Sequence, residues 1–152
     1  MLRTEPVILV IEDCSDDLQL LQRLFSKAGL RKSLRSVPDG VEAMSYLLGR
    51  GKYADRENYP EPNILLIDIN MPRVNGLELM GWLRTQPDFE YLVVIALSGS
   101  AEQDEIDRAY QMGANSYLLK PASATELERV IEAFYCYWVG ANCLPRGGPI
   151  SR

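Results

Sequence analysis

The 152-residue sequence contains no histidine. Imidazole is the side chain that most often serves as a general base, a metal ligand or a proton carrier near neutral pH. Every mechanism that needs an imidazole within this chain is therefore excluded. Any histidine chemistry must be supplied by a partner protein.

Cysteine and long apolar runs are scarce as well. The three cysteines, Cys14, Cys136 and Cys143, are odd in number and form no CxxC pair, which favours reduced thiols over disulfides or zinc ligands. Cys136 and Cys143 are interpreted as structural residues. The longest apolar stretches, residues 91–97 and 133–139, fall far short of the ~20 residues that cross a bilayer, and the first residues do not resemble a signal peptide. We expect a cytoplasmic protein without a membrane segment.

An excess of basic residues is also missing. The formal net charge is -5 and the pI is near 4.8, whereas nucleic-acid-binding domains typically show a basic face and a pI above ~9. Proteins are therefore the expected partners, without direct contact to nucleic acid. With 47% hydrophobic and 24% charged residues, the composition is that of a globular protein, and the length predicts a single domain over residues 1–152.

What the sequence does contain is an alternation of strand-like apolar runs with helical patterns. The five predicted strands are Val7–Ile11, Ser33–Val37, Ile64–Ile67, Leu92–Leu97 and Ser116–Leu119. The third and fourth are continuously apolar, as central strands are, and the second alternates polar and apolar residues as an edge strand does. The alternation predicts an α/β fold in which a doubly wound, five-stranded parallel sheet lies between two layers of helices.

Capping signals indicate where the helices begin and end. The first helix is predicted to follow a cap at Ser15 and to stop at Gly29. The last begins at the S-x-x-E capping box of Ser123 and Glu126. The three helices between them are predicted over Val41–Leu48, Gly76–Thr85 and Glu102–Met112. Residues 49–62 are predicted to form a surface loop.

Polar side chains follow four of the predicted strands at their carboxyl ends, which is where open parallel sheets bind ligands. They are Glu12, Asp13, Asp68, Ser98 and Lys120. Each residue alone has an ordinary structural explanation, such as a favourable helix-dipole contact or a turn. Because all five fall on one edge of the sheet, a shared site is the better interpretation.

The chemistry of these groups points to phosphoryl transfer. Clustered carboxylates stay ionised only if a cation offsets their charge, and Mg²⁺ prefers oxygen ligands beside a phosphoryl group. We therefore predict Asp13 and Asp68 as direct Mg²⁺ ligands and Glu12 as a ligand through a water molecule. Asp68 could then attack phosphorus while Lys120 and Ser98 stabilise the charge on the phosphoryl oxygens. The predicted product is an aspartyl phosphate.

These residues lie in motifs that resemble the receiver domains of bacterial response regulators, the CheY-like family. The motifs are Val10-Ile11-Glu12-Asp13, Ile67-Asp68-Ile69-Asn70-Met71-Pro72 with Asn75-Gly76, Ala96-Leu97-Ser98-Gly99 and Tyr117-Leu118-Leu119-Lys120-Pro121. The resemblance covers residues 6–139, leaves 140–152 as a tail, and implies a flavodoxin-like fold. It also implies a two-component signalling protein that takes a phosphoryl group from a sensor histidine kinase. Such a protein is not an enzyme, because it catalyses only its own phosphorylation and dephosphorylation.

The resemblance assigns roles to the site residues. Asp68 would be the phosphoacceptor and would bind Mg²⁺ together with Asp13 and the backbone carbonyl of Asn70. Lys120 would pair with Asp68 or its phosphate, and the Lys120–Pro121 peptide bond would be cis.

Two further positions, Ser98 and Tyr117, would form a switch pair. In the family the hydroxyl turns to the phosphate and the aromatic ring moves inward, which remodels the surface of the fourth helix, fifth strand and fifth helix.

Two positions depart from the family pattern. Glu12 replaces the more usual aspartate, and Gly99 stands where alanine is usual.

A narrower resemblance connects the chain with the stand-alone regulators of cyanobacterial phytochrome histidine kinases. It rests on residues 68–72, the long loop before the third strand, and the aromatic run at 134–138. It implies a light-responsive kinase as the donor.

The end of the last helix carries more apolar surface than one helix face can bury. Its aromatic residues are Phe134, Tyr135, Tyr137 and Trp138. Such a surface is typical of a protein interface, which predicts a homodimer. The alternative is that residues 140–152 fold back and cover it.

Three other functions remain as alternatives. A phosphatase of the haloacid-dehalogenase type needs an aspartate two residues after the acceptor, where this chain has Asn70. A flavodoxin-like flavin carrier needs a loop rich in Ser, Thr and Gly after the first strand, where Glu12 and Asp13 would repel the phosphate. A phosphorylation-independent pseudo-receiver is disfavoured because all the residues needed for phosphorylation are present.

Overall fold

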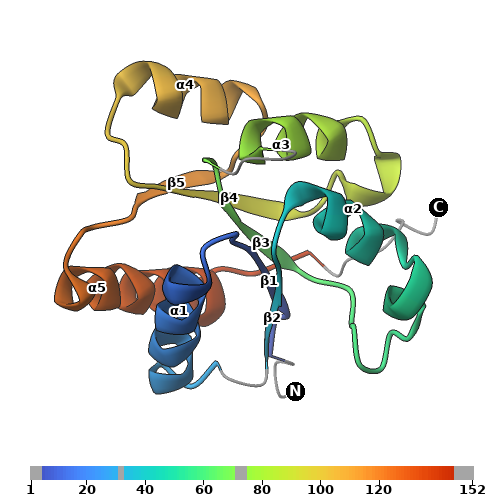
Figure 1. Cartoon of the computed structure of the whole chain (residues 1–152), viewed down its shortest axis with the longest axis horizontal. Coiled ribbons are helices and arrows are strands. Elements are labelled where there is room, and N and C mark those ends of the chain that lie inside the picture. Colours follow the sequence, from blue (N-terminus) through green and yellow to red (C-terminus); the bar gives the residue numbers. More distant parts are fainter. Residues whose placement is uncertain (1–4, 31–32, 71–74, 146–152) are drawn as a thin grey trace.

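The computed structural model describes residues 5–30, 33–70 and 75–145. Its five strands are β1 (Ile8–Ile11), β2 (Leu34–Val37), β3 (Ile64–Asp68), β4 (Val93–Ser98) and β5 (Ser116–Leu119). They form one parallel sheet with the order β2-β1-β3-β4-β5 (Figure 1). This is the doubly wound order of flavodoxin-like proteins, so the predicted fold is confirmed. The second predicted strand lies at an edge, as its alternating pattern indicated.

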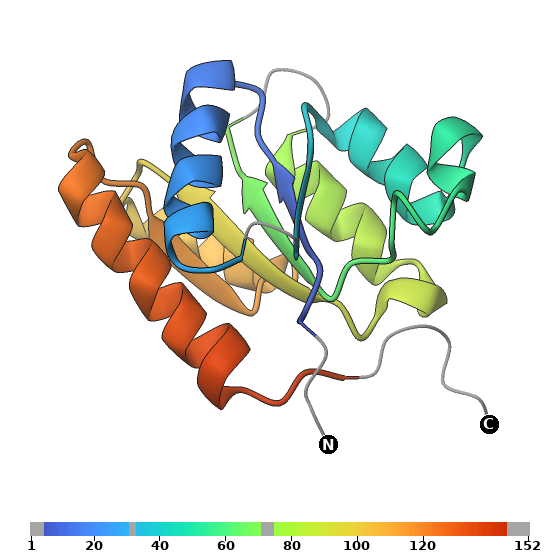
Figure 2. The ribbon, with the colours of Figure 1, turned by 90° about the horizontal axis from the view of Figure 1, so that it is seen from below.

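Helices cover both faces of the sheet. They are α1 (Ser15–Lys27), α2 (Gly40–Leu48), α3 (Gly76–Arg84), α4 (Gln103–Gln111) and α5 (Ala124–Phe134). Helices α1 and α5 lie on one face, and α2, α3 and α4 lie on the other (Figures 1 and 2). Each face has its own apolar core, because successive residues of the continuously apolar strands point to opposite sides.

Capping at the ends of α1 and α5 agrees with the sequence in part. The Glu126 backbone amide donates a hydrogen bond to Ser123 Oγ, at 3.3 Å, so the predicted cap at Ser123 is confirmed. Gly29, with φ at +94°, follows the end of α1 as predicted. The predicted Ser15 cap is wrong, because Ser15 is the first residue of α1 and Cys14 is its N-cap. The Cys14 amide donates instead to Glu12 Oε1, at 3.2 Å.

Residues 49–62 are more ordered than the predicted surface loop. They include the short 3-10 helix η2 (Gly51–Ala54), in which Tyr53 is buried against the rings of Tyr46 and Tyr59. The Arg56 guanidinium donates hydrogen bonds to backbone carbonyls at the end of α2, including that of Tyr46 at 2.9 Å. The contacts between these rings and the hydrogen bonds of Arg56 therefore hold the segment against the domain. A second 3-10 helix, η3 (Pro87–Phe89), follows α3.

Helix α5 continues as a π-helical segment, η4 (Tyr135–Ala141), which the sequence did not predict. Phe134 is 2% exposed and packs edge-to-face on Phe25, with ring centroids 5.6 Å apart. Tyr135 and Trp138 are half-buried against the same core, whereas Tyr137 is 54% exposed. Phe134 is thus removed from the surface that a partner could contact.

Three general expectations can be compared with the described residues. None of their helices is both long and apolar enough to cross a membrane. Cys14, Cys136 and Cys143 form no disulfide, as predicted. All three are exposed, so the interpretation of Cys136 and Cys143 as structural residues gains no support from packing.

Candidate functional site

The strand register brings the predicted site residues to one edge of the sheet. Asp68 ends β3 opposite Leu97, and Ser98 ends β4 opposite Leu119, directly before Lys120. Glu12 follows β1, whose last residue pairs with the residue before Asp68. The sequence placed Asp68 and Ser98 just after their strands, whereas each is the last residue of its strand.

Three carboxylates form the centre of the site. Glu12, Asp13 and Asp68 each offer an oxygen, and these oxygens all lie within 4.8 Å of one another. Glu12 is 2% exposed and Asp68 8% exposed, while Asp13 faces solvent. An open-sided group of oxygen ligands fits a hard divalent cation that keeps some of its waters. The donor set is therefore suited to Mg²⁺ or Mn²⁺ rather than to a metal that prefers nitrogen or sulfur.

The electrostatics of Glu12 show the same need for a cation. Burial, followed by the negative charge of Asp68, raises the pKa of Glu12 to about 7, although Lys120 opposes this shift. A buried carboxyl beside a second carboxylate carries a cost in its charged form. A divalent cation would remove that cost, because its charge favours the ionised form.

Lys120 ties the acidic cluster together. Its ammonium lies 3.0 Å from Glu12 Oε2, 2.8 Å from Asp17 Oδ2 and 3.6 Å from Asp68 Oδ2. Burial would lower the pKa of Lys120, but hydrogen bonds to Asp17 and Glu12 outweigh it and raise the pKa above its usual value. The ammonium is therefore a permanent positive charge beside Asp68.

The predicted cis bond between Lys120 and Pro121 is wrong. The described residues contain no cis peptide bond. A trans bond before proline is the more stable isomer by ~0.5–1 kcal/mol. With the bond trans, the Lys120 ammonium already reaches its carboxylate partners, so the lysine needs no cis bond to point into the site.

Asp17 is a site residue that sequence reasoning missed. It was interpreted only as a favourable charge in the first turn of α1, a position that it does occupy. The available signal was its position, because Asp17 is in the first turn of the helix that begins directly after Asp13 and Cys14. The start of α1 lies at the same edge of the sheet, where Asp17 forms the shortest of the Lys120 ion pairs.

The chain after Asp68 shapes the acceptor. The Asn70 amide donates to Asp68 Oδ1 at 3.0 Å and so orients the carboxylate. The Met71-Pro72 part of the motif lies outside the described residues. Asn75 caps α3, since its side chain accepts a hydrogen bond from the Glu78 amide at 2.9 Å. Gly76 packs so closely that an added Cβ would lie 2.7 Å from the Asp68 carbonyl oxygen.

Ser98 lies on β4, the strand beside the one that carries Asp68, and Tyr117 lies on the next strand, β5. The Ser98 side chain is fully buried, and its hydroxyl donates to Glu105 Oε1 at 3.3 Å. The Tyr117 hydroxyl donates to the Ser100 carbonyl at 2.8 Å. Its ring is half-buried against the apolar core on the face that α2, α3 and α4 cover. Gly99 leaves its surroundings open, because an added Cβ would meet nothing closer than the Lys120 carbonyl oxygen at 4.0 Å.

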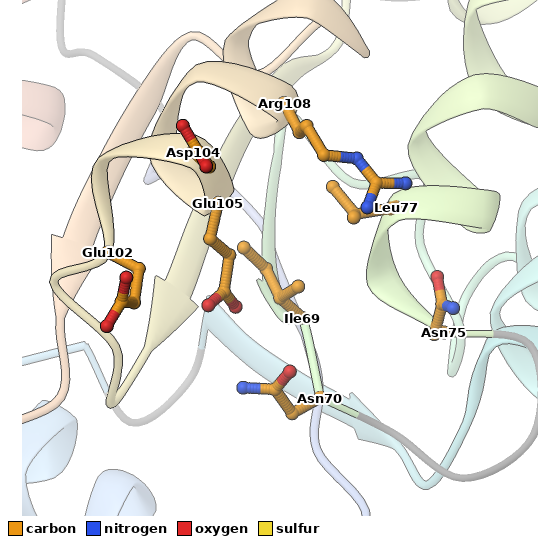
Figure 3. Close-up of a pocket in the computed structure, with 8 residues that line it drawn as sticks. All are labelled: Ile69, Asn70, Asn75, Leu77, Glu102, Asp104, Glu105 and Arg108. Carbon is orange, nitrogen blue, oxygen red and sulfur yellow. The ribbon is translucent and has the colours of Figure 1, made fainter.

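A pocket of about 430 Å³ opens next to Asn70, between the start of α3 and the start of α4 (Figure 3). Its lining residues are Ile69, Asn70, Asn75, Leu77, Glu102, Asp104, Glu105 and Arg108. In Figure 3 the Glu105 carboxylate reaches down from α4 toward Asn70, and Arg108 points across toward Leu77. Sequence reasoning did not single out Glu105, which contacts Ser98 from α4, the helix that directly follows β4.

A doubly wound sheet with a metal-fitting carboxylate cluster and a fixed ammonium at its carboxyl edge defines a phosphoryl-accepting receiver. Residues 8–132 match the family described as response regulator receiver domain, and the chain belongs to this family. Members of the family are generally phosphorylated and bind Mg²⁺. The chain is thus a two-component response regulator, a signalling protein whose partner is a histidine kinase.

The chain is similar to several response regulators, and the names of two of them mention phytochrome or red light. Response regulator Rcp1 from Synechocystis sp. is 30% identical over 139 residues, which is 91% of this chain and 92% of Rcp1. The crystal structure of response regulator RPA3017 in red light signaling of R. palustris is 38% identical, with a TM-score of 0.86, and covers 92% of this chain and 98% of that one. The phosphorylated cyanobacterial phytochrome response regulator RcpA is 28% identical, with a TM-score of 0.85, over 93% and 99% of the two chains.

A relative with a bound metal ion indicates which kind of cation the carboxylate cluster could hold. The structure of the Mn²⁺-bound form of Rcp1 covers 92% of this chain and 99% of that one, with 30% identity and a TM-score of 0.79. Together with the carboxylate cluster, this supports a divalent-metal site in the family fold.

Proposed function

We propose that Asp68 accepts a phosphoryl group from a phosphohistidine of a sensor histidine kinase, in a reaction that requires Mg²⁺. The observation that carries this proposal is the convergence of three carboxylates within 4.8 Å, with the Lys120 ammonium 3.6 Å from Asp68. An Asp68 oxygen would form the new bond to phosphorus as the bond from phosphorus to the histidine nitrogen breaks. We further propose that the protein is one receiver domain over residues 6–139 with a tail, and that it turns over no other substrate.

Each residue of the site has a part in this transfer. Asp13, Asp68 and the backbone carbonyl of Asn70 would hold Mg²⁺, and Glu12 would contact it through a water molecule. The bound metal would supply positive charge that offsets the carboxylates and the phosphoryl oxygens. Lys120 would stabilise the same oxygens, and a break of its 2.8 Å contact with Asp17 would let it move toward the phosphate.

We also propose that Ser98 and Tyr117 transmit phosphorylation to the surface. The Ser98 hydroxyl would turn toward the phosphate at Asp68. Tyr117 hydrogen-bonds the Ser100 carbonyl in the β4–α4 loop, so a shift of that loop reaches its ring directly. The surface formed by α4, β5 and α5 would change as a result, and partner proteins would read that change.

The donor that we propose is a phytochrome histidine kinase acting in the cytoplasm. Support comes from the similarity to RcpA, Rcp1 and RPA3017, whose names link two of them to phytochrome or red light. The chain also covers nearly the full length of each of these proteins, so the similarity extends beyond a shared core.

Phosphotransfer from a radiolabelled kinase tests this function. With Mg²⁺ present, a purified phytochrome histidine kinase is expected to label this chain within minutes and at least ~10-fold faster than an unrelated histidine kinase does, because docking surfaces discriminate partners. Chelation of divalent metal is expected to lower the rate ~100-fold or more, because the carboxylates are then left uncompensated. Equal rates with and without chelator would contradict the metal role. Equal rates from both kinases would contradict the phytochrome pairing.

We propose in addition that the chain forms a homodimer through α5 and η4. The support is Tyr137, which remains 54% exposed while its ring packs edge-to-face on Trp138, with centroids 5.0 Å apart. Leu144 packs against the core beside this segment, so the first part of the tail covers some of the apolar surface and leaves Tyr137 open. Exposed aromatic residues of this kind are typical anchors of interfaces.

Sedimentation at micromolar concentration tests the dimer. Tyr137→Lys is expected to weaken association at least ~10-fold, since it places a charge in an apolar interface. Leu48→Lys is the matched control, because Leu48 is 39% exposed on α2, which covers the opposite face of the sheet. A parent chain that sediments as a monomer would refute the dimer. A loss of association that is equal in both variants would refute its placement at η4.

A further inference from the structure

The Ser98 hydroxyl is completely enclosed by polar partners. It is 0% exposed, accepts hydrogen bonds from the Ser100 amide at 3.1 Å and the Asn70 side-chain amide at 3.5 Å, and donates to Glu105 Oε1 at 3.3 Å. A serine hydroxyl has one proton and two lone pairs. All of its hydrogen-bonding capacity is therefore in use, and its one proton points to a carboxylate on α4.

That single proton can serve only one acceptor at a time. Under the proposed function, a phosphoryl group on Asp68 needs the Ser98 hydroxyl as a donor, and the hydroxyl must then leave Glu105. We propose that Glu105 is a positioning residue that holds the Ser98 hydroxyl in the unphosphorylated state and opposes its transfer to the phosphate. The inference rests on the proposed function, because the competing acceptor is the phosphoryl group at Asp68.

The charge of Glu105 works in the same direction. When Ser98 turns away, the carboxylate loses its donor while a phosphoryl group of about two negative charges is formed nearby. Like charges repel, so Glu105 is pushed from the site. The 430 Å³ pocket in front of it gives the side chain room to move, and Arg108, one turn along α4, faces the same space (Figure 3).

Through this hydrogen bond, α4 contributes to the free energy of phosphorylation. Glu105 belongs to the first turn of α4, and Ser98 ends β4, so the hydrogen bond joins the helix to the acceptor site directly. Tyr117 lies within reach of the same carboxylate. Burial raises the pKa of Tyr117, and the charge of Glu105 raises it further, although the nearby Ser98 hydroxyl opposes the shift. Glu105 therefore interacts with both members of the proposed switch pair, Ser98 through a hydrogen bond and Tyr117 through its charge.

Beryllofluoride, a non-covalent mimic of a phosphoryl group, provides the test. Its affinity in the presence of Mg²⁺ is measured by ¹⁹F NMR on the full chain. Glu105→Ala is expected to bind about tenfold more tightly than the parent, because a hydrogen bond to a charged group no longer has to be broken. Glu102→Ala is the matched control, since Glu102 is an exposed acid of the same pocket that directly precedes α4. It is expected to change the affinity less than twofold.

A double-mutant cycle identifies the hydroxyl as the link. In a Ser98→Ala background, Glu105→Ala is expected to change the affinity less than twofold, because the contested proton is gone. Glu105→Gln keeps the size and an acceptor oxygen but loses the charge, so its gain is expected to fall between the parent and Glu105→Ala. That variant carries the test if Glu105→Ala does not fold.

Two outcomes would overturn the inference. One is an equal gain from Glu105→Ala and Glu102→Ala, which would show a general charge effect. The other is an undiminished gain from Glu105→Ala in the Ser98→Ala background, which would exclude the hydroxyl. Failure of the proposed function looks different, because beryllofluoride would then bind Asp68→Asn as well as it binds the parent.

Discussion

Asp68→Asn is expected to lose phosphoryl labelling completely, to below ~1% of the parent rate, with a histidine kinase or a small acyl phosphate as donor. An amide oxygen is a far weaker nucleophile than a carboxylate, and the substitution removes one charge from the proposed metal site. Asparagine has nearly the same shape as aspartate. It also keeps a side-chain oxygen that can accept the hydrogen bond from the Asn70 backbone amide. The fold is therefore expected to persist. The measurement is base-labile radiolabel on the gel-purified chain.

Asp16→Asn is the matched control for this loss. Like Asp68→Asn, it removes one negative charge. Asp16 is an exposed residue in the first turn of α1, three residues after Asp13. We expect it to be labelled at a rate within about threefold of the parent, because exposed charges are screened by solvent. Full base-labile labelling of Asp68→Asn would show that another residue is the acceptor.

Gly76→Ala is expected to lower the free energy of unfolding by about 1–3 kcal/mol and to slow labelling as well. An added Cβ would lie 2.7 Å from both the Asp68 carbonyl oxygen and Ile69 Cα, and 2.9 Å from an Ile67 side-chain atom. Two of these neighbours are backbone, so the clash cannot be relieved by a rotamer change. The segment that carries Asp68 has to move. Urea denaturation measures the stability, and the labelling assay measures the site.

Gly99→Ala is the matched control, because it replaces a glycine beside the site without creating a steric clash. Gly99 is also next to the site, yet an added Cβ there would meet only the Lys120 carbonyl oxygen, at 4.0 Å. Its expected change in unfolding free energy is within about 0.5 kcal/mol. If both substitutions cost the same, the close approach of Gly76 to β3 is not what requires glycine.

Most of the site could be predicted because its residues sit at strand ends. An apolar run such as 64–67 predicts a buried strand, and in a parallel sheet the residue at its carboxyl end faces the ligand-binding edge. Asp68 and Lys120 follow from this rule, whichever partner strands they have. The family motifs then supplied the roles.

Asp17 and Glu105 escaped prediction for a common reason. Both lie on helices, where an acidic residue in the first turn has a sufficient explanation in the helix dipole. Whether such a carboxylate faces solvent or reaches over the sheet edge depends on how the helix is rotated against the sheet. That rotation is set by the packing of residues far away in sequence, such as Phe25 on Phe134.

The wrong predictions have a similar origin. Ser15 fits the chemistry of a cap, but α1 begins one residue earlier than predicted, with Cys14 as its N-cap and the Cys14 amide bonded to Glu12. A glycine- and proline-containing run at 49–62 fits a surface loop, but Tyr53 finds two aromatic partners there. Local preferences of ~1 kcal/mol are overridden when tertiary contacts of equal size are available.

By itself, the sequence determined the order of the elements, the sheet edge at which the chemistry lies and the identity of Asp68 as the candidate acceptor. These depend on periodicity and on strand ends, which are local in the chain. Only the tertiary structure decided which side chains share the Lys120 ammonium and the Ser98 proton. The first contact joins α1 to the end of β5, which are distant in the chain, so it exists only once these elements have packed. The second joins β4 to the helix that follows it, and it depends on how α4 is rotated against the sheet.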